Sequence, residues 1–217
     1  MTAFGSILIG LTGGIGTGKS RVAELLRSLG AAVECSDAIV RELQAPGGEG
    51  LAAIVATFGR EYLTDAGELD RPKLGKLVFD DAGARVRLNL IIHPLVTRET
   101  QARVAAHRAR DVTVIVADIP LLLEGKKAGI GSGAVLPFDA IAVVYATEEQ
   151  QLARILARDA LSREDALARI RAQLPIEEKR AQADVVIDNS GSWEATEKQV
   201  RGLYADWVKR AKSGLRG

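Results

Sequence analysis

The chain has 217 residues and a formal net charge of +1, a length that suits one domain with insertions and a sizeable core. The balanced charge favours neither a nucleic-acid partner nor a membrane surface, and no apolar run approaches the ~18 residues of a spanning helix. The single cysteine, Cys35, excludes an internal disulfide and favours a reducing cytoplasm. We expect a cytoplasmic monomer.

Residues 13–20 read GGIGTGKS, which fits the phosphate-binding pattern G-x-x-x-x-G-K-S. Glycines let the backbone curve so that its N–H groups face phosphate oxygens. Lys19 is expected to reach the β- and γ-phosphates of ATP, and the Ser20 hydroxyl to ligate Mg²⁺. The expected ATP-binding residues of the loop are Gly14, Ile15, Gly16, Thr17, Gly18, Lys19 and Ser20.

The flanks of this loop have the patterns that a P-loop needs. Residues 6–12, SILIGLT, suit a buried parallel strand. Apolar residues then recur at helical spacing from Val22 to Leu29, and Gly30 ends the pattern. This context favours a P-loop over a simple glycine turn. A Rossmann motif fits less well, because Lys19 stands where G-x-G-x-x-G needs glycine.

Apolar, β-branched stretches predict four more strands, at residues 31–35, 112–117, 140–145 and 185–188. Helical patterns alternate with them, so the predicted class is α/β, a three-layer fold with a five-stranded parallel sheet. The site is expected at the carboxyl ends of the strands. Residues 51–110 are predicted to be a helical insertion with a helix boundary at His93-Pro94. The glycine-rich residues 125–138 are predicted to be a mobile loop.

Two carboxylates stand at predicted strand ends. Asp37 follows the second strand, where it is either the acceptor of a proton from a substrate hydroxyl or a helix cap. Asp118 ends the third strand, the setting of a Walker-B aspartate that helps to hold Mg²⁺, with a turn residue as the alternative.

Basic side chains gather between residues 150 and 182. Arg154 and Arg158 share a face of a helix that a capping box, Thr147 to Gln150, is expected to begin. More basic residues follow, Lys179 among them. Together they could stabilise the charge on a transferring phosphoryl group, although a solvated face is the better interpretation of any single arginine among them. We therefore expect a lid in this stretch.

In order along the chain, these segments resemble the dephospho-CoA kinase family. The phosphate loop alone is shared by many families, but the ordered set is specific. The matching segments are residues 10–20, Asp37 with Arg41, and residues 67–71, 88–89, 93–94, 118–124, 151–154, 158–159, 173 and 183–191.

The resemblance implies a nucleoside-kinase-like P-loop fold in one domain, 1–217. The core is expected at residues 1–50, 111–149 and 183–217, a helical CoA-binding insertion at about 51–110, and the lid at about 150–182. It also implies that the γ-phosphoryl of ATP passes to the ribose 3′-hydroxyl of dephospho-CoA. The cofactors implied are ATP and Mg²⁺.

The resemblance also implies roles for single residues. Asp37 is the expected catalytic base, with Lys19 and Arg154 as the other catalytic residues. Asn189 and Gly191 are expected near the adenine. The expected acceptor-binding residues are Asp37, Arg41, Arg71, His93 and Leu121, and the expected metal ligands are Ser20 and Asp118.

Two features depart from the family pattern. Cys35-Ser36-Asp37 stands where the family commonly has Asp-Ala-Asp, and residues 125–138 form a longer stretch than usual. The main alternative is another P-loop kinase that acts on a nucleotide or a metabolite hydroxyl. A GTPase switch would need an N-K-x-D motif, which the sequence lacks. A pure ATP-binding scaffold would not need Asp37 opposite the P-loop.

Overall fold

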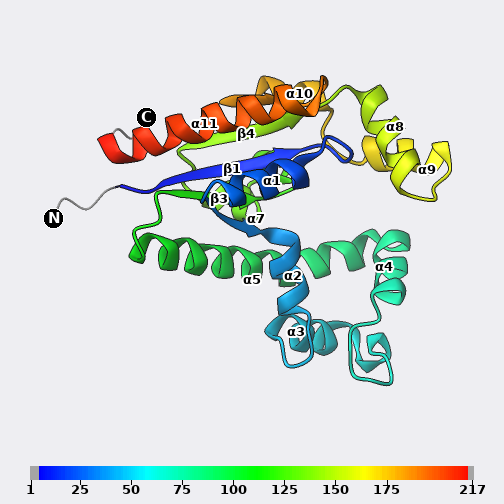
Figure 1. Cartoon of the computed structure of the whole chain (residues 1–217). Coiled ribbons are helices and arrows are strands. Elements are labelled where there is room, and N and C mark those ends of the chain that lie inside the picture. Colours follow the sequence, from blue (N-terminus) through cyan, green and yellow to red (C-terminus); the bar gives the residue numbers. More distant parts are fainter. Residues whose placement is uncertain (1–4, 215–217) are drawn as a thin grey trace.

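Five parallel strands form one sheet in the computed structural model, which describes residues 5–214 (Figure 1). Their order is β2-β3-β1-β4-β5. The strands are β1 (Ile7–Gly13), β2 (Ala32–Cys35), β3 (Val114–Asp118), β4 (Ala140–Tyr145) and β5 (Val185–Asp188). All five strands that the sequence predicts are confirmed, and so is the α/β class.

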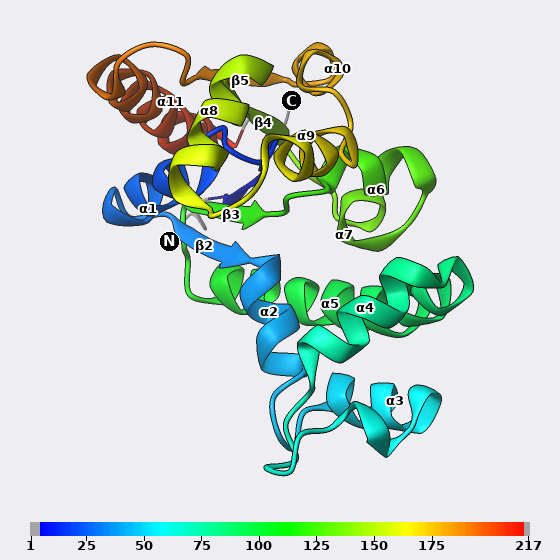
Figure 2. The same cartoon turned by 90° about the vertical axis from the view of Figure 1, so that its right-hand side faces the viewer.

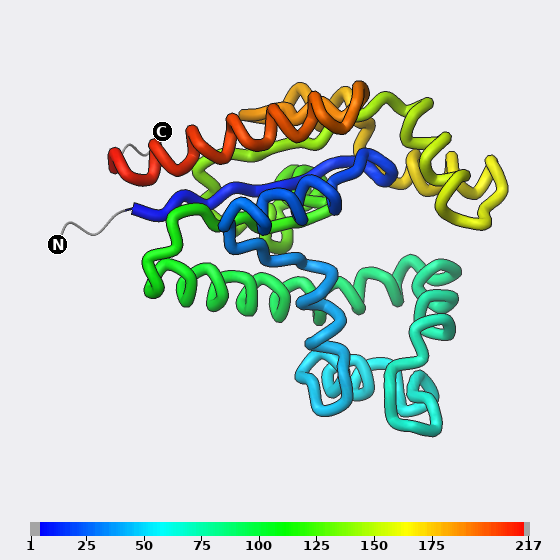
Figure 3. Tube along the Cα trace, viewed as in Figure 1, coloured from blue at the N-terminus to red at the C-terminus, as the bar shows by residue number. Residues whose placement is uncertain are grey.

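Helices cover both faces of the sheet. They are α1 (Lys19–Ser28), α2 (Ser36–Leu43), α3 (Glu49–Phe58), the 3-10 helix η1 (Arg60–Tyr62), α4 (Arg71–Asp80), α5 (Ala82–Ala109), α6 (Leu122–Ala128), α7 (Gly131–Val135), α8 (Glu148–Arg158), α9 (Arg163–Arg171), α10 (Ile176–Ala181) and α11 (Trp193–Ser213). The trace leaves the sheet through α2, passes through α3 and α4, and returns along α5 (Figures 1 and 3). None of the helices described here is long and apolar enough to cross a membrane.

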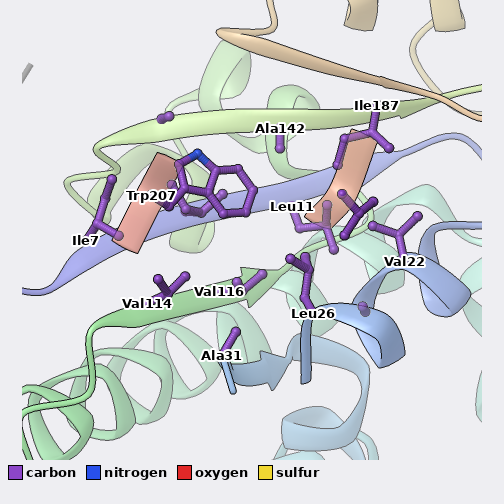
Figure 4. Packing of buried hydrophobic residues seen from close by; sticks show 14 of the residues in the cluster. Ile7, Leu11, Val22, Leu26, Ala31, Val114, Val116, Ala142, Ile187 and Trp207 are labelled. Carbon is purple, nitrogen blue, oxygen red and sulfur yellow. The ribbon is translucent and has the colours of Figure 1, made fainter. Parts of the chain in front are cut away.

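Neighbouring residues of β1 are buried in opposite layers. Leu11 packs with α1 and α11, where the indole of Trp207 is 2% exposed (Figure 4). Leu8 belongs to a second cluster on the other face, which includes Val104 of α5 and Ile176 of α10. Because successive side chains of a strand point to opposite faces, burial on both sides produces the continuous apolar run seen in the sequence.

Residues 51–110 are mainly helical, and α2 to α5 enclose an apolar cluster of their own. The predicted helix boundary at His93-Pro94 is wrong, because α5 runs through Pro94. Proline removes the hydrogen bond to the carbonyl four residues earlier, that of Leu90. Leu90 is 70% exposed, so water can reach that side of the helix, while Ile92 and Val96 anchor the opposite face. Tertiary packing thus outweighs the local cost of the proline.

Residues 125–138, predicted to be a mobile loop, are largely helical, so the prediction of a loop is wrong. The segment contains most of α6 and all of α7, which pack against each other (Figure 2). A Cβ at Gly133 would collide with the carbonyl of Leu122, and Gly129 turns the chain between the helices with a φ of 68°. These glycines therefore permit close packing and a tight turn between two short helices.

Candidate active site

The carboxyl ends of three strands bring the candidate residues to one edge of the sheet. In the sheet register, Asp118 of β3 lies opposite Leu11 of β1 and Cys35 of β2. The phosphate loop begins two residues beyond Leu11, and Asp37 stands two residues beyond Cys35. Parallel pairing thus gathers residues that are far apart in the sequence, as the open-sheet rule for binding sites leads one to expect.

The phosphate loop runs from the end of β1 into α1 and is closely packed. Gly16 and Gly18 have φ angles of 79° and 89°, which glycine adopts without strain. A Cβ at Gly16 would lie 2.7 Å from the backbone oxygen of Gln151. The Thr17 hydroxyl donates a 2.8 Å hydrogen bond to the carbonyl of Gly14, which fixes the curve of the loop.

Arg154 and Asn189 hold this loop from outside. Arg154 donates to the carbonyls of Gly16 and Thr17 at 3.3 Å and to that of Asn189 at 2.8 Å. The side-chain amide of Asn189 donates to the carbonyl of Thr17 at 2.7 Å. Both residues therefore lie at the phosphate loop, while Gly191 is exposed further along the same turn.

Lys19 and Asp118 form an ion pair at the centre of this edge. The side chains are only 13% and 6% exposed, so the pair is shielded from water. Ser20 follows Lys19 in the first turn of α1 and is exposed. The two expected metal ligands thus lie beside Lys19. Ser20 is its neighbour in the sequence, and Asp118 is its partner in the ion pair.

A cavity of about 570 Å³ opens beside these residues, between α2, α5 and the segment after β3. Three of the expected acceptor-binding residues line it, namely Asp37, His93 and Leu121. Arg71 lies at its margin, where the guanidinium donates a 2.6 Å hydrogen bond to Gln44, another lining residue. Arg41 is exposed and is not part of the lining.

Asp37 does not cap a helix. The cap position of α2 is Cys35, which provides no side-chain hydrogen bond, and Asp37 is the second residue of the helix. The side chain is exposed and lines the cavity. Of the two interpretations that the local sequence allows, the structure therefore removes the helix cap.

His93 lies where this cavity meets a second one of about 560 Å³. Partial burial lowers the pKa of His93 below its ordinary value of 6.5, because a charged imidazole is poorly solvated there. The second cavity is largely apolar and includes Leu90, Pro94 and Val135. The two cavities together offer room for a long acceptor.

Sequence reasoning misjudged Lys179 and missed Glu124 as a site residue. Lys179 of α10 is fully buried instead of belonging to a solvated basic face, and its ammonium lies 2.8 Å from a carboxylate oxygen of Glu124. Glu124 lines the cavity beside Asp37. The position of Lys179 three residues after the buried Ile176, on the inward face of α10, is the signal that could have identified it.

Comparisons with known proteins agree on one family. Residues 7–195 match the family model described as dephospho-CoA kinase. A dephospho-CoA kinase of Carboxydothermus hydrogenoformans is 45% identical over 92% of this chain and 94% of its own length. One of Syntrophotalea carbinolica is 43% identical over 95% and 94%.

Solved structures share the fold of this chain, and one of them is a dephospho-CoA kinase. TT1252 from Thermus thermophilus is 36% identical, with a TM-score of 0.75 over 93% of this chain and 98% of its own. Dephospho-CoA kinase from Campylobacter jejuni is 26% identical, with a TM-score of 0.66 over 95% and 98%. Shikimate kinase from Acinetobacter baumannii, 18% identical with a TM-score of 0.50 over 94% of both chains, shares the fold.

Proposed function

The chain belongs to the dephospho-CoA kinase family, and on that premise we propose that the phosphate loop and the cavity beside Asp37 are the two halves of its active site. The protein transfers the γ-phosphoryl of ATP to the ribose 3′-hydroxyl of dephospho-CoA, giving coenzyme A and ADP. ATP binds at residues 13–20, and the acceptor occupies the cavity. The transfer takes place where the two sites meet, near Lys19 and Asp118.

On the nucleotide side, the N–H groups of the loop and the Lys19 ammonium hold the β- and γ-phosphates. To do so, Lys19 exchanges its carboxylate partner, Asp118, for phosphate oxygens. Arg154 already lies against the loop carbonyls, which leaves its guanidinium close to charge that develops on the transferring phosphoryl group. Asn189 and Gly191 form the turn that borders the adenine.

The residues around Lys19 fit a magnesium ion. Ser20 and Asp118 offer a hydroxyl and a carboxylate, the oxygen donors that Mg²⁺ prefers beside phosphate groups. A magnesium ion held by these residues would supply positive charge that offsets the negative charge of the β- and γ-phosphate oxygens. Ser20 and Asp118 would hold it from the two sides of Lys19.

Asp37 is the general base, and the single observation that carries this role is the place of its carboxylate. Its carboxylate lines the acceptor cavity and provides no helix cap. A ribose hydroxyl is a poor nucleophile unless its proton is accepted as the bond to phosphorus forms. Asp37 orients that hydroxyl and takes the proton.

The remaining acceptor contacts come from the helical region 51–110 and from core residues beside the cavity. His93 and Leu121 line the cavity, and Arg71 at its margin supplies positive charge for the acceptor pyrophosphate. Arg41 of α2 is exposed and lies outside the cavity lining, so it would meet only a part of the acceptor that extends beyond the cavity. We assign CoA binding to that helical region and closure over ATP to residues 150–182.

We also propose that the protein is a cytoplasmic monomer without a nucleic-acid partner. The near-neutral charge gives it no field that would attract nucleic acid. The lone, partly exposed Cys35 is compatible with a reducing compartment.

The test is incubation with MgATP and a panel of acceptors: dephospho-CoA, nucleoside monophosphates and shikimate. We expect ADP release and formation of coenzyme A with dephospho-CoA alone. Phosphorylation of a nucleoside monophosphate or of shikimate, without turnover of dephospho-CoA, would contradict the function. Turnover of dephospho-CoA by an Asp37→Asn variant at the parental rate would contradict the role of Asp37 only.

A further inference from the structure

A buried ion pair connects the wall of the acceptor cavity to α10. Lys179 is 0% exposed, and its ammonium lies 2.8 Å from Glu124. The same ammonium donates a 3.2 Å hydrogen bond to the carbonyl of Pro120. Pro120, Leu121 and Glu124 all line the cavity, so Lys179 holds both ends of one short stretch of its wall.

The same stretch is linked to the phosphate loop. The Pro120 carbonyl accepts a second hydrogen bond, at 3.0 Å, from the hydroxyl of Thr12, which immediately precedes the loop on β1. Just before α10, the side chain of Gln173 accepts a 2.9 Å hydrogen bond from the N–H of Ile15 within the loop. Segments on either side of the transfer point are therefore fixed to one another through these contacts.

Glu124 also holds the chain that leads into α10. The carboxylate oxygen that faces Lys179 accepts a 2.9 Å hydrogen bond from the N–H of Leu174. Residues 173–179 thus contact the phosphate loop at one end and the cavity wall at the other. Any shift of this segment would change the spacing between the two substrates.

Stabilisation of the fold does not account well for the ion pair between Lys179 and Glu124. The second carboxylate oxygen of Glu124 is buried and has no hydrogen-bond partner among the residues that the structure describes. Burial lowers the pKa of Lys179, Glu124 opposes that effect, and the nearby Lys19 lowers it further. Buried ion pairs of this kind are often no more stable than apolar residues of the same size.

We propose that Lys179 is a positioning residue for phosphoryl transfer. Through Glu124 and Pro120 it sets the distance between the acceptor-cavity wall and the phosphate loop. The inference rests on the proposed placement of dephospho-CoA in this cavity. It predicts that loss of the pair impairs use of the acceptor more than binding of ATP, because the loop amides and Lys19 remain in place.

The test uses the double variant Lys179→Met/Glu124→Gln, which removes both charges at similar volume. We expect kcat/KM for dephospho-CoA to fall by roughly 10²-fold, the effect of a misplacement of about 1 Å. The KM for ATP should change by less than about threefold, since uniform ATP binding is retained. Lys126→Met, on the exposed side of α6, is the matched control and should behave like the parent.

A purely structural pair would alter the fraction of folded enzyme and lower turnover equally for both substrates, without this split. Lys179→Met alone should melt earlier than the double variant, because it leaves the Glu124 carboxylate buried and unpaired. A folded double variant with parental kcat/KM for dephospho-CoA would overturn the proposal, and so would a double variant that cannot fold. If the parent itself fails to use dephospho-CoA, the proposed function is what has failed.

Discussion

Replacement of Asp37 by Asn distinguishes a catalytic role of the carboxylate from a structural one. The substitution keeps the shape of the side chain and removes its charge and basicity. Because Asp37 is exposed and caps no helix, the free energy of unfolding should change by less than about 0.5 kcal/mol. If the carboxylate accepts the proton of the ribose hydroxyl, turnover should fall by ~10²–10⁴-fold. That loss corresponds to about 3–5 kcal/mol of transition-state stabilisation.

The assay is steady-state kinetics with dephospho-CoA, beside a melting curve of the same preparation. ATP binding should be nearly unchanged, because Asp37 belongs to the acceptor side of the site. Asp80→Asn, the same chemical change at the exposed end of α4 and outside the cavity lining, is a matched control. An Asp37→Asn enzyme that melts like the parent and turns over within a few-fold of it would refute the role of base. The transfer would then depend on positioning and electrostatics alone.

Three further outcomes test other parts of the site. Lys19→Ala should lower turnover by roughly 10²–10³-fold. It should also lower the melting temperature, because Asp118 is left buried and unpaired. Adding Asp118→Asn should restore stability but not turnover, and parental turnover in either variant would exclude Lys19 as a phosphate ligand. Amide exchange in residues 150–182 should slow when ATP and acceptor bind together, and unchanged exchange there beside a protected phosphate loop would exclude a lid. Burial lowers the pKa of His93 in the folded state, so the unfolded chain binds the proton more readily and stability should decrease as pH falls below about 6.5. Urea unfolding between pH 5 and 8 should show a flatter dependence in His93→Gln, and identical slopes would contradict this.

The sheet was predictable because its signal is local. The three central strands, β1, β3 and β4, are buried on both faces, so each appears in the sequence as a short, nearly continuous apolar run. The helix boundary at His93-Pro94 was not predictable by the same reasoning. A proline usually ends a helix, but Ile92 and Val96 anchor α5 on both sides of Pro94. That anchoring depends on residues of α2 to α4, which no local pattern reveals.

The candidate site also has a part that local sequence patterns predict and a part that they do not. Lys19, Asp37 and Asp118 each follow or end a strand, so the rule that parallel strands present their carboxyl ends at one edge was enough to group them. Glu124 and Lys179 come from separate helices, and their sequence spacing carries no information about contact. Lys179 is buried because α10 packs against the sheet, and a buried ammonium needs an oppositely charged partner, which Glu124 provides.

The two groups of site residues differ in what holds them in place. Groups at strand ends are fixed by the sheet, which neither substrate can readily deform. The acceptor wall at Pro120 to Glu124 is instead held by side chains from α10, at the end of the segment that we expect to close over ATP. Closure of residues 150–182 would therefore pull on the contacts of Gln173 and Lys179 and adjust the acceptor wall at the same time. If residues 150–182 close in this way, the acceptor hydroxyl would be aligned only when ATP is enclosed, which would disfavour transfer of the phosphoryl group to water.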